Sequence, residues 1–196
     1  MSILDLGFSS SEDLQRQLQM AAPVVDEIFA ESGLADSNFA KLLQAGYSPK
    51  EIFDLTDAEM EALFLFGCQA LDVGELQRAA DIFTKLCQLD ALDARFPFAL
   101  GAALQLQGSF GLAAKMYLLA LALNASRVDV YVRLGECLIA AGEFTEAREV
   151  LGIAITLAGP GDEPAKLQAE SLLVHVSERA DNASTDDDAR LHGDFN

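Results

Sequence analysis

The side chains that most often carry catalysis are few in this 196-residue sequence and lie far apart. The only two histidines, His175 and His192, lie near the C-terminus, so no Ser/His/Asp or Cys/His arrangement is supported. The glycine-containing stretch 108–111 lacks the following Lys-Ser/Thr that a phosphate-binding loop needs, and it suits a turn between helices. We therefore predict that the protein is not an enzyme, that it has no catalytic residue and that it uses no cofactor.

Candidate metal ligands are equally poorly spaced. Cys68, Cys87 and Cys137 lie 19 and 50 residues apart, which fits neither a zinc site nor a disulfide framework. The acidic run at 186–188 lacks the alternating ligands and distal glutamate of a calcium loop. The cysteines are better explained as buried reduced thiols on helices, and we predict no metal site.

The strongest pattern in the chain is a spacing of 34 residues, shared by Gly67, Gly101 and Gly135. The same spacing recurs in four further sets: Gly74, Gly108 and Gly142; Ala79, Ala113 and Ala147; Phe83, Tyr117 and Leu151; and Leu89, Leu123 and Leu157. This period and residue chemistry are those of the tetratricopeptide repeat, which has two antiparallel helices per unit. We therefore predict an all-α fold, an α-solenoid of three tetratricopeptide repeats.

The repeated glycines have two different physical roles. Gly67 and its equivalents fall within helices, where glycine costs about 1 kcal/mol relative to alanine, so their recurrence predicts close contact between helices. Ala79 should have the same role on the second helix, and Phe83 lies one turn further along the same face. Gly74 and its equivalents should end each first helix, because glycine adopts left-handed dihedrals at little cost.

Capping signals set the element boundaries. Ser48 and Thr56 each precede a glutamate by three residues, which predicts two capping boxes. The repeat helices are then expected at about 57–73, 75–89, 94–107, 109–123, 127–141 and 143–157. The predicted divisions are an N-terminal amphipathic helical segment at 1–47, repeats within 48–161 (60–93, 94–127 and 128–161), a C-terminal capping helix at 162–180 and an acidic disordered tail at 181–196.

The net charge and the hydropathy of the chain limit the classes of partner that it can bind. The formal net charge of −18 would repel a phosphate backbone, so nucleic acid binding is not expected. Residues 1–59 hold 11 Asp/Glu against 3 Lys/Arg, and residues 162–196 hold 9 against 3, which predicts solvated acidic ends. No apolar run is long enough to cross a bilayer and the N-terminus lacks the pattern of a signal peptide, so we expect a cytoplasmic protein that does not insert into a membrane.

The first helix of each repeat should line the concave side of the solenoid. When the marker alanine is position 20 of each repeat, positions 5, 9 and 12 form one largely apolar stripe, to which Leu106 adds. Such a stripe favours binding of an extended apolar peptide. The predicted peptide-binding residues are Phe64, Cys68, Leu71, Phe98, Ala102, Gln105, Leu106, Val132, Glu136 and Ile139.

Two other uses of the concave side compete with this one. The N-terminal segment, with apolar residues between Leu14 and Phe29, must dock on the repeats or on another subunit, and it could cover the stripe permanently. A clamp for a C-terminal carboxylate needs lysines and asparagines at inner positions, where only Arg95 and Arg133 are cationic. An adaptor role for heat-shock proteins is therefore disfavoured.

Residues 46–155 resemble the class II chaperones of bacterial type III secretion, which bind hydrophobic translocator proteins. The resemblance is carried by residues 46–53 (GYSPKEIF), 83–90 (FTKLCQLD), 93–96 (DARF) leading into 100–102 (LGA), and 135–138 (GECL). It implies a cytoplasmic, virulence-associated chaperone that holds an extended translocator segment in its concave groove and often dimerises through N-terminal helices. Pro97 stands where the family usually has a large residue, which predicts a late start for that helix.

Other functional classes stay open at the level of the sequence. One is a repeat scaffold or a chaperone for needle subunits, although those are usually shorter and lack the lead-in at 46–53. The other is a regulator that acts through a transcription activator, a role that the family sometimes combines with chaperoning.

Overall fold

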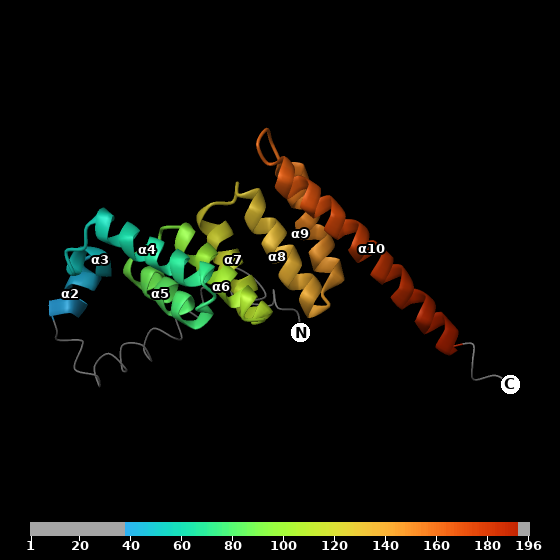
Figure 1. The fold of residues 1–196 in the computed structure, drawn as a ribbon, viewed down its shortest axis with the longest axis horizontal. Coiled ribbons are helices and arrows are strands. Elements are labelled where there is room, and N and C mark those ends of the chain that lie inside the picture. The colour runs from blue at the N-terminus through green and yellow to red at the C-terminus, as the bar shows by residue number, and fades with distance from the viewer. Residues whose placement is uncertain (1–37, 192–196) are drawn as a thin grey trace.

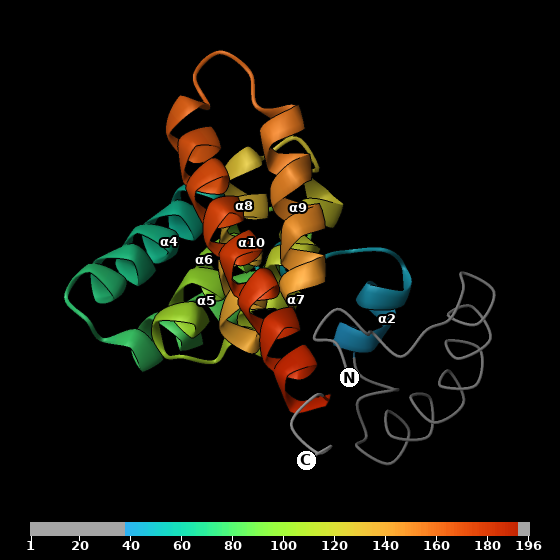
Figure 2. The same ribbon diagram turned by 90° about the vertical axis from the view of Figure 1, so that its right-hand side faces the viewer.

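A computed structural model of the protein describes residues 38–191, with side chains described from residue 41 to residue 177. The elements of this range, all of them helices, are α2 (Asn38–Gln44), α3 (Pro49–Ile52), α4 (Asp57–Asp72), α5 (Leu76–Leu89), α6 (Arg95–Leu106), α7 (Phe110–Leu123), α8 (Val128–Ala141), α9 (Phe144–Leu157) and α10 (Glu163–Leu191). Three hairpins, α4–α5, α6–α7 and α8–α9, stack along one direction, and α10 packs on the last hairpin and projects beyond it (Figures 1 and 2). The predicted all-α solenoid of tetratricopeptide repeats is confirmed.

The solenoid is curved with its first helices on the inside. Among the described residues α4 contacts α6, α6 contacts α8 and α8 contacts α10, whereas the second helices α5, α7 and α9 do not contact one another. Each second helix instead packs between the first helix of its own repeat and that of the next. We use the term inner face for the solvent-facing side of α4, α6 and α8.

The repeated glycines that follow the first helices close them in the same way each time. In the third repeat Gly142 has a φ of 81°, its N–H donates to Ile139 O (3.0 Å), and the next N–H, of Glu143, donates to Leu138 O (2.9 Å). This pair of bonds is the Schellman motif, which requires a left-handed residue that glycine supplies without a Cβ clash. Gly74 and Gly108 repeat the arrangement, with φ values of 81° and 78°.

The glycines within the first helices mark direct contact with the second helices. A Cβ on Gly67 would lie 2.6 Å from the Phe83 ring, a Cβ on Gly101 would lie 2.7 Å from the Tyr117 ring, and a Cβ on Gly135 would lie 2.6 Å from Leu151 Cδ2. The three large side chains are fully buried. Each repeat is therefore built on one interlock, in which a large side chain occupies the space left by a missing Cβ.

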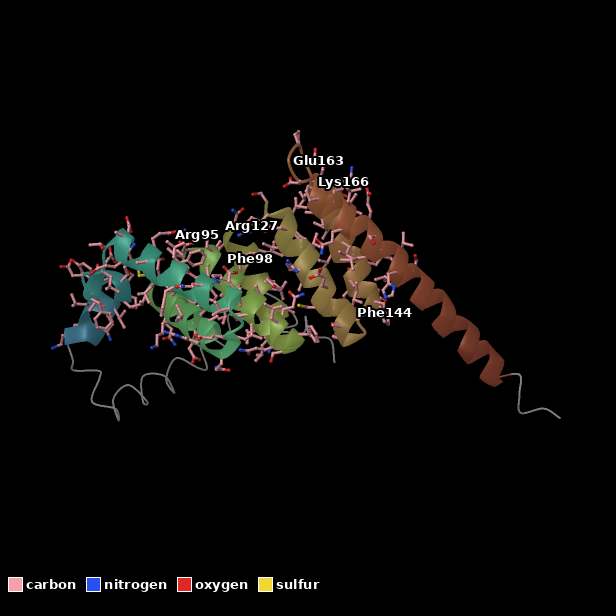
Figure 3. The ribbon with its side chains drawn as sticks, viewed as in Figure 1. Arg95, Phe98, Arg127, Phe144, Glu163 and Lys166 are labelled. Atoms are coloured by element: carbon pink, nitrogen blue, oxygen red, sulfur yellow. The ribbon has the colours of Figure 1, made fainter. Side chains whose placement is uncertain are left out.

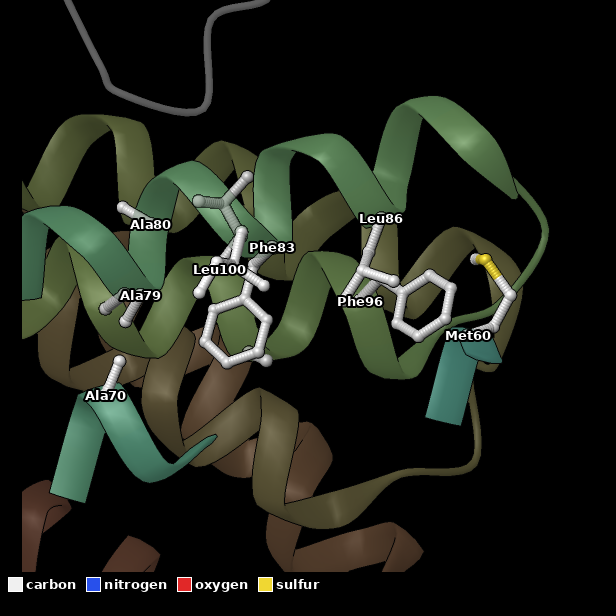
Figure 4. Close-up of a cluster of buried hydrophobic side chains, with 11 residues drawn as sticks. Met60, Ala70, Ala79, Ala80, Phe83, Leu86, Phe96 and Leu100 are labelled. Atoms are coloured by element: carbon white, nitrogen blue, oxygen red, sulfur yellow. The ribbon is translucent and has the colours of Figure 1, made fainter. Parts of the chain in front are cut away.

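The core extends through the stack as three adjoining clusters, and the first is shown in Figure 4. Phe83 and Leu86 of α5 pack there against Phe96 and Leu100 of α6, so the cluster joins the first repeat to the second. The two remaining clusters join the second repeat to the third and the third to α10. Each cluster draws side chains from two neighbouring units, so we expect the hairpins to be stable only as a stack.

Both predicted capping boxes are present. The Ser48 hydroxyl accepts from Glu51 N–H and the Glu51 carboxylate accepts from Ser48 N–H, and Thr56 and Glu59 make the same pair of bonds. Because the hydrogen bonds stabilise the charged carboxylates, the pKa values of Glu51 and Glu59 lie below the usual glutamate value. Together the boxes define the start of α3 and of α4.

Three features differ from the sequence-based expectations. The second repeat does not start late, because Pro97 lies in the first turn of α6, where a missing N–H leaves no intrahelical bond unmade. Phe66 lies one 34-residue period before Leu100, a buried residue, so the repeat pattern would place it in the interior, yet it is 44% exposed. The last helix continues to Leu191 instead of ending near Ala180, since the sequence contains no glycine or proline between Pro164 and Gly193 that would end it.

The N-terminal helical segment and the dimer contact that it would provide fall mainly on residues 1–37, which lie outside the described residues. Within the described part of the chain, no helix combines the length and the apolarity needed to cross a membrane.

We predict that Gly101→Ala destabilises the fold by about 1–2 kcal/mol, measured by urea unfolding. The new Cβ meets the ring of Tyr117, which is fully buried and cannot move aside, and this overpacking exceeds the gain in helix propensity. Gly152→Ala is the matched control: it also lies within a helix, but its Cβ would meet nothing within 4 Å, so stability should stay equal or rise. Equal effects of the two substitutions would contradict the interlock.

Candidate peptide-binding groove

Phe64 on α4 joins two repeats at the inner face. Its ring is half-buried, with its centroid 5.8 Å from the Phe83 ring on α5 and 5.8 Å from the Phe96 ring on α6. The guanidinium of Arg95 lies 5.2 Å from the centre of the Phe64 ring. The contacts are those of tilted aromatic pairs and a cation–π contact, and they fix the ring in one position.

Phe98 occupies the equivalent position in the second repeat and has an equivalent environment. Its ring centroid lies 5.8 Å from that of Tyr117, and the Arg127 guanidinium lies 4.2 Å from its centre. Arg127 is itself paired with Asp129 at the start of α8. Figure 3 shows Phe98 beside Arg127, with Arg95 further along the same side of the stack. Two aromatic rings, each covered by an arginine, therefore stand one repeat apart.

Polar side chains link three helices around Glu136. The Tyr117 hydroxyl donates to Gln105 Oε1 (2.7 Å), and Gln105 Nε2 donates to Glu136 Oε2 (2.8 Å). Arg133 donates to the same oxygen (3.1 Å), and Gln168 Nε2 of α10 donates to Glu136 Oε1 (2.5 Å). The network ties α6, α8 and α10 together at the inner face. Burial raises the pKa of Tyr117, so its hydroxyl keeps the proton that it donates.

The other residues of the predicted stripe differ in accessibility. Cys68, Leu71, Ala102 and Ile139 are half-buried, whereas Leu106 is 62% exposed. Val132 is only 2% exposed, because it packs in a core cluster with Ala169 of α10. The stripe therefore reaches the surface continuously in the first two repeats, and in the third repeat only through Glu136 and Ile139.

The arginines of the inner face are neutralised by neighbouring carboxylates. Arg95 donates to Glu61 Oε2 (2.8 Å) and to Asp93 Oδ2 (2.7 Å), and Arg133 pairs with Glu136. Burial of Asp93 would raise its pKa, but the bonds from Arg95 outweigh burial and hold the pKa below the usual value. No cation at these positions is left to clamp a free carboxylate, which agrees with the sequence-based argument against such a clamp.

The arginines that cover Phe64 and Phe98 were not among the predicted site residues. Arg95 is the first residue of α6 and Arg127 immediately precedes α8. The sequence shows both cations at the starts of consecutive first helices, but only the folded hairpins bring each one over a ring of the preceding first helix. Leu65 was also missed, although its side chain is 59% exposed on α4.

The three thiols have no metal-binding arrangement. Among residues with described side chains, no group of three His, Cys, Asp or Glu side chains could hold a metal ion. Burial raises the pKa of Cys137 to about 12 and that of Cys87 to about 11, and it also raises the pKa of the less buried Cys68. All three therefore remain protonated at neutral pH.

The chain is similar to known proteins in sequence and in fold. A family model of the tetratricopeptide repeat matches residues 104–171. The chain is 28% identical, over 57% of its length and 67% of the relative's, to the low calcium response locus protein H of Yersinia pestis.

Several similar solved structures come from type III secretion. A type III secretion complex from Aeromonas hydrophila aligns with a TM-score of 0.68 and 28% identity, covering 73% of this chain and 97% of the other. The Yersinia enterocolitica translocator chaperone SycD aligns when in complex with a peptide of the translocator YopD (TM-score 0.61, 26% identity, 64% and 98% coverage). SycD as an alternative dimer aligns equally well (TM-score 0.62, 26% identity, 64% and 97% coverage). The resemblance to translocator chaperones inferred from the sequence is confirmed.

We predict that Glu136→Gln lowers the free energy of unfolding by about 1 kcal/mol in chemical denaturation. The amide loses the charge that accepts from Arg133, and its Nε2 must face one of the two glutamine donors. Glu149→Gln, at an exposed position on α9, removes the same charge without such bonds and should leave the free energy of unfolding unchanged. An unchanged free energy of unfolding in Glu136→Gln would show that the network does not contribute to stability.

We also predict an order of thiol labelling by a disulfide reagent at pH 8, followed by mass spectrometry. The thiolate reacts, and a pKa raised from about 8.5 to about 12 reduces its population, so Cys137 should react roughly a thousandfold more slowly than in urea. Cys68, less buried, should react first. Rapid labelling of Cys137 in the folded protein would contradict the burial described.

Proposed function

We propose that the protein is a cytoplasmic type III secretion chaperone that binds an extended segment of a hydrophobic translocator protein along its inner face. The observation that carries this proposal is the combined sequence and structural similarity to SycD, whose structure has been solved with a translocator peptide. The aromatic and aliphatic side chains of the first helices supply a surface of the chemistry that such a peptide requires.

The apolar contacts would come mainly from the first two repeats. Leu65 and Leu106 are 59% and 62% exposed, and Phe64 and Phe98 present the half-buried edges of fixed rings. At about 25 cal/mol per Å² of apolar area, three or four client side chains could contribute several kcal/mol after the cost of ordering the peptide. Because the rings of Phe64 and Phe98 are already held in place by arginines, binding costs little side-chain conformational entropy.

The polar network around Glu136 would supply a hydrogen-bond acceptor for the backbone of the bound peptide. A carboxylate can accept about four hydrogen bonds, and Glu136 accepts three within the protein, from Gln105, Arg133 and Gln168. One acceptor site remains for a backbone N–H of an extended segment, which has no internal partner of its own. We therefore expect apolar anchoring over α4 and α6 and a polar contact at α8.

The mechanism is passive and needs no nucleotide. A segment that would otherwise aggregate or enter a membrane stays soluble and competent for secretion while its apolar side chains are held by the chaperone. Homodimerisation stays part of the proposal, and the dimeric form of the similar SycD supports it.

We predict that Phe98→Asp abolishes co-purification of a co-expressed translocator while helical content, measured by circular dichroism, is retained. The charge would replace an apolar contact in the centre of the stripe. Leu106→Asp is a second variant at a side chain that is 62% exposed, so loss of folding cannot explain its effect; we expect at least about a tenfold loss of affinity, equivalent to 1.4 kcal/mol.

Ile153→Asp is the matched control, because Ile153 is similarly exposed (45%) but lies on α9, a second helix outside the inner face. Equal binding by wild type, Leu106→Asp and Ile153→Asp would overturn the assignment of the inner face. Failure of the wild type to bind any translocator would overturn the function itself.

A further inference from the structure

One side of the first helix of the first repeat is exposed, whereas the equivalent side is buried in the second and third repeats. On α4 the side chains of Ala62, Phe66, Gln69 and Val73 lie three or four residues apart along one side, and all are exposed. Phe66 is 44% exposed and Val73 is 66% exposed. We call these four residues the open end, since they form the outer side of the first repeat.

The equivalent side of the later repeats is a helix-docking surface. One period further on, Phe96, Leu100 and Ala103 are 2%, 7% and 0% exposed, because α5 packs on this side of α6. Two periods on, Val130, Leu134 and Cys137 are at most 1% exposed beneath α7. The open end therefore has the position and spacing of a surface that receives a helix, but no described helix packs on it.

Helices α2 and α3 do not cover the open end. Shifting α5 back by one 34-residue period gives residues 42–55, where a preceding second helix would be expected. That stretch is broken by Gly46, with a φ of 93°, and by the helix start at Pro49. Within the described range neither α2 nor α3 packs on α4, and Leu55 reaches only the first core cluster near Met60.

Phe66 is shielded only by a surface side chain. The Arg78 guanidinium of α5 lies 4.6 Å from the centre of the Phe66 ring and pairs with Glu75 at 2.7 Å. These residues, with Gln69, Ala70 and Val73, line a shallow pocket at the open end. Arg78 is itself half exposed, so a docking helix could pack against its aliphatic stem and against the ring.

We propose that the open end is covered by the N-terminal segment of the same chain, through the apolar side chains between Leu14 and Phe29. Leu14 and Leu18, and likewise Val25 and Phe29, have the spacing of one helical face. The segment lies directly upstream of the interrupted stretch, as a preceding helix must. It is the nearest upstream stretch whose apolar side chains are numerous enough to cover the open end.

The reach of the chain permits this contact. Residues 30–37 can span up to about 27 Å when extended, which is comparable with the ~24 Å length of the 16-residue α4. A segment that ends near Phe29 is therefore joined to Asn38, the start of α2, by a stretch that exceeds the length of α4 when it is extended. The proposal leaves the inner face free, so it is independent of the proposed client.

Hydrogen exchange of the full-length protein, without any client, tests the proposal. Amides of residues 11–32 should exchange at least about tenfold more slowly than in the urea-unfolded chain, equally at about 1 µM and 50 µM protein, since the contact is within one chain. Phe66→Asp should remove this protection, and Val73→Asp, at a more exposed position, should reduce it at least about fivefold without loss of the fold. Ile153→Asp, an equally apolar exposed position on α9, should leave it unchanged.

Three outcomes would overturn the proposal. The first is an unprotected segment in the wild type, and the second is protection that survives both Phe66→Asp and Val73→Asp. The third is protection that disappears on dilution together with a dimer seen by light scattering, which would assign the open end to a second copy.

Discussion

The structure depends on one repeated contact, in which a large side chain of a second helix packs where a glycine of the first helix has no Cβ. A methyl group on Gly67, Gly101 or Gly135 would lie 2.6–2.7 Å from that side chain, closer than van der Waals contact permits. The contact sets the distance between the two helices of each hairpin, and it does so at the same position every 34 residues. Because the spacing is constant, successive hairpins stack with the same curvature and their core clusters join.

The same buried side chains connect the core to the inner face. The Tyr117 ring fills the space beside Gly101, packs at a tilt against Phe98 and donates its hydroxyl hydrogen to Gln105, which in turn donates to Glu136. The Phe83 ring similarly fills the space beside Gly67 and packs at a tilt against Phe64. The candidate binding surface is therefore positioned by core packing, and this explains how the solenoid could hold a peptide with fixed side chains.

The two ends of the stack differ in whether a helix covers them. At the C-terminal end α10 buries Ala169 and Val176 against the third repeat, and in doing so it also buries Val132, which would otherwise continue the stripe. At the N-terminal end Phe66 and Val73 stay exposed within the described residues. A stack of identical hairpins always leaves one docking surface at each end. The long helix α10 covers the C-terminal one, and the apolar segment upstream of α2 is our proposal for the N-terminal one.

The sequence by itself determined the repeat, the helix bounds to within about a residue for the six repeat helices, and both capping boxes, because these follow from local spacing, glycine dihedrals and backbone hydrogen bonds. It also placed Phe64 and Phe98 on one face. Only the tertiary structure decided that arginines cover those rings, that Glu136 joins three helices and that Val132 is buried while Phe66 is not. Each of these depends on which helix lies alongside in space, and a period that is the same in every repeat cannot distinguish a repeat with two neighbours from one at the end of the stack.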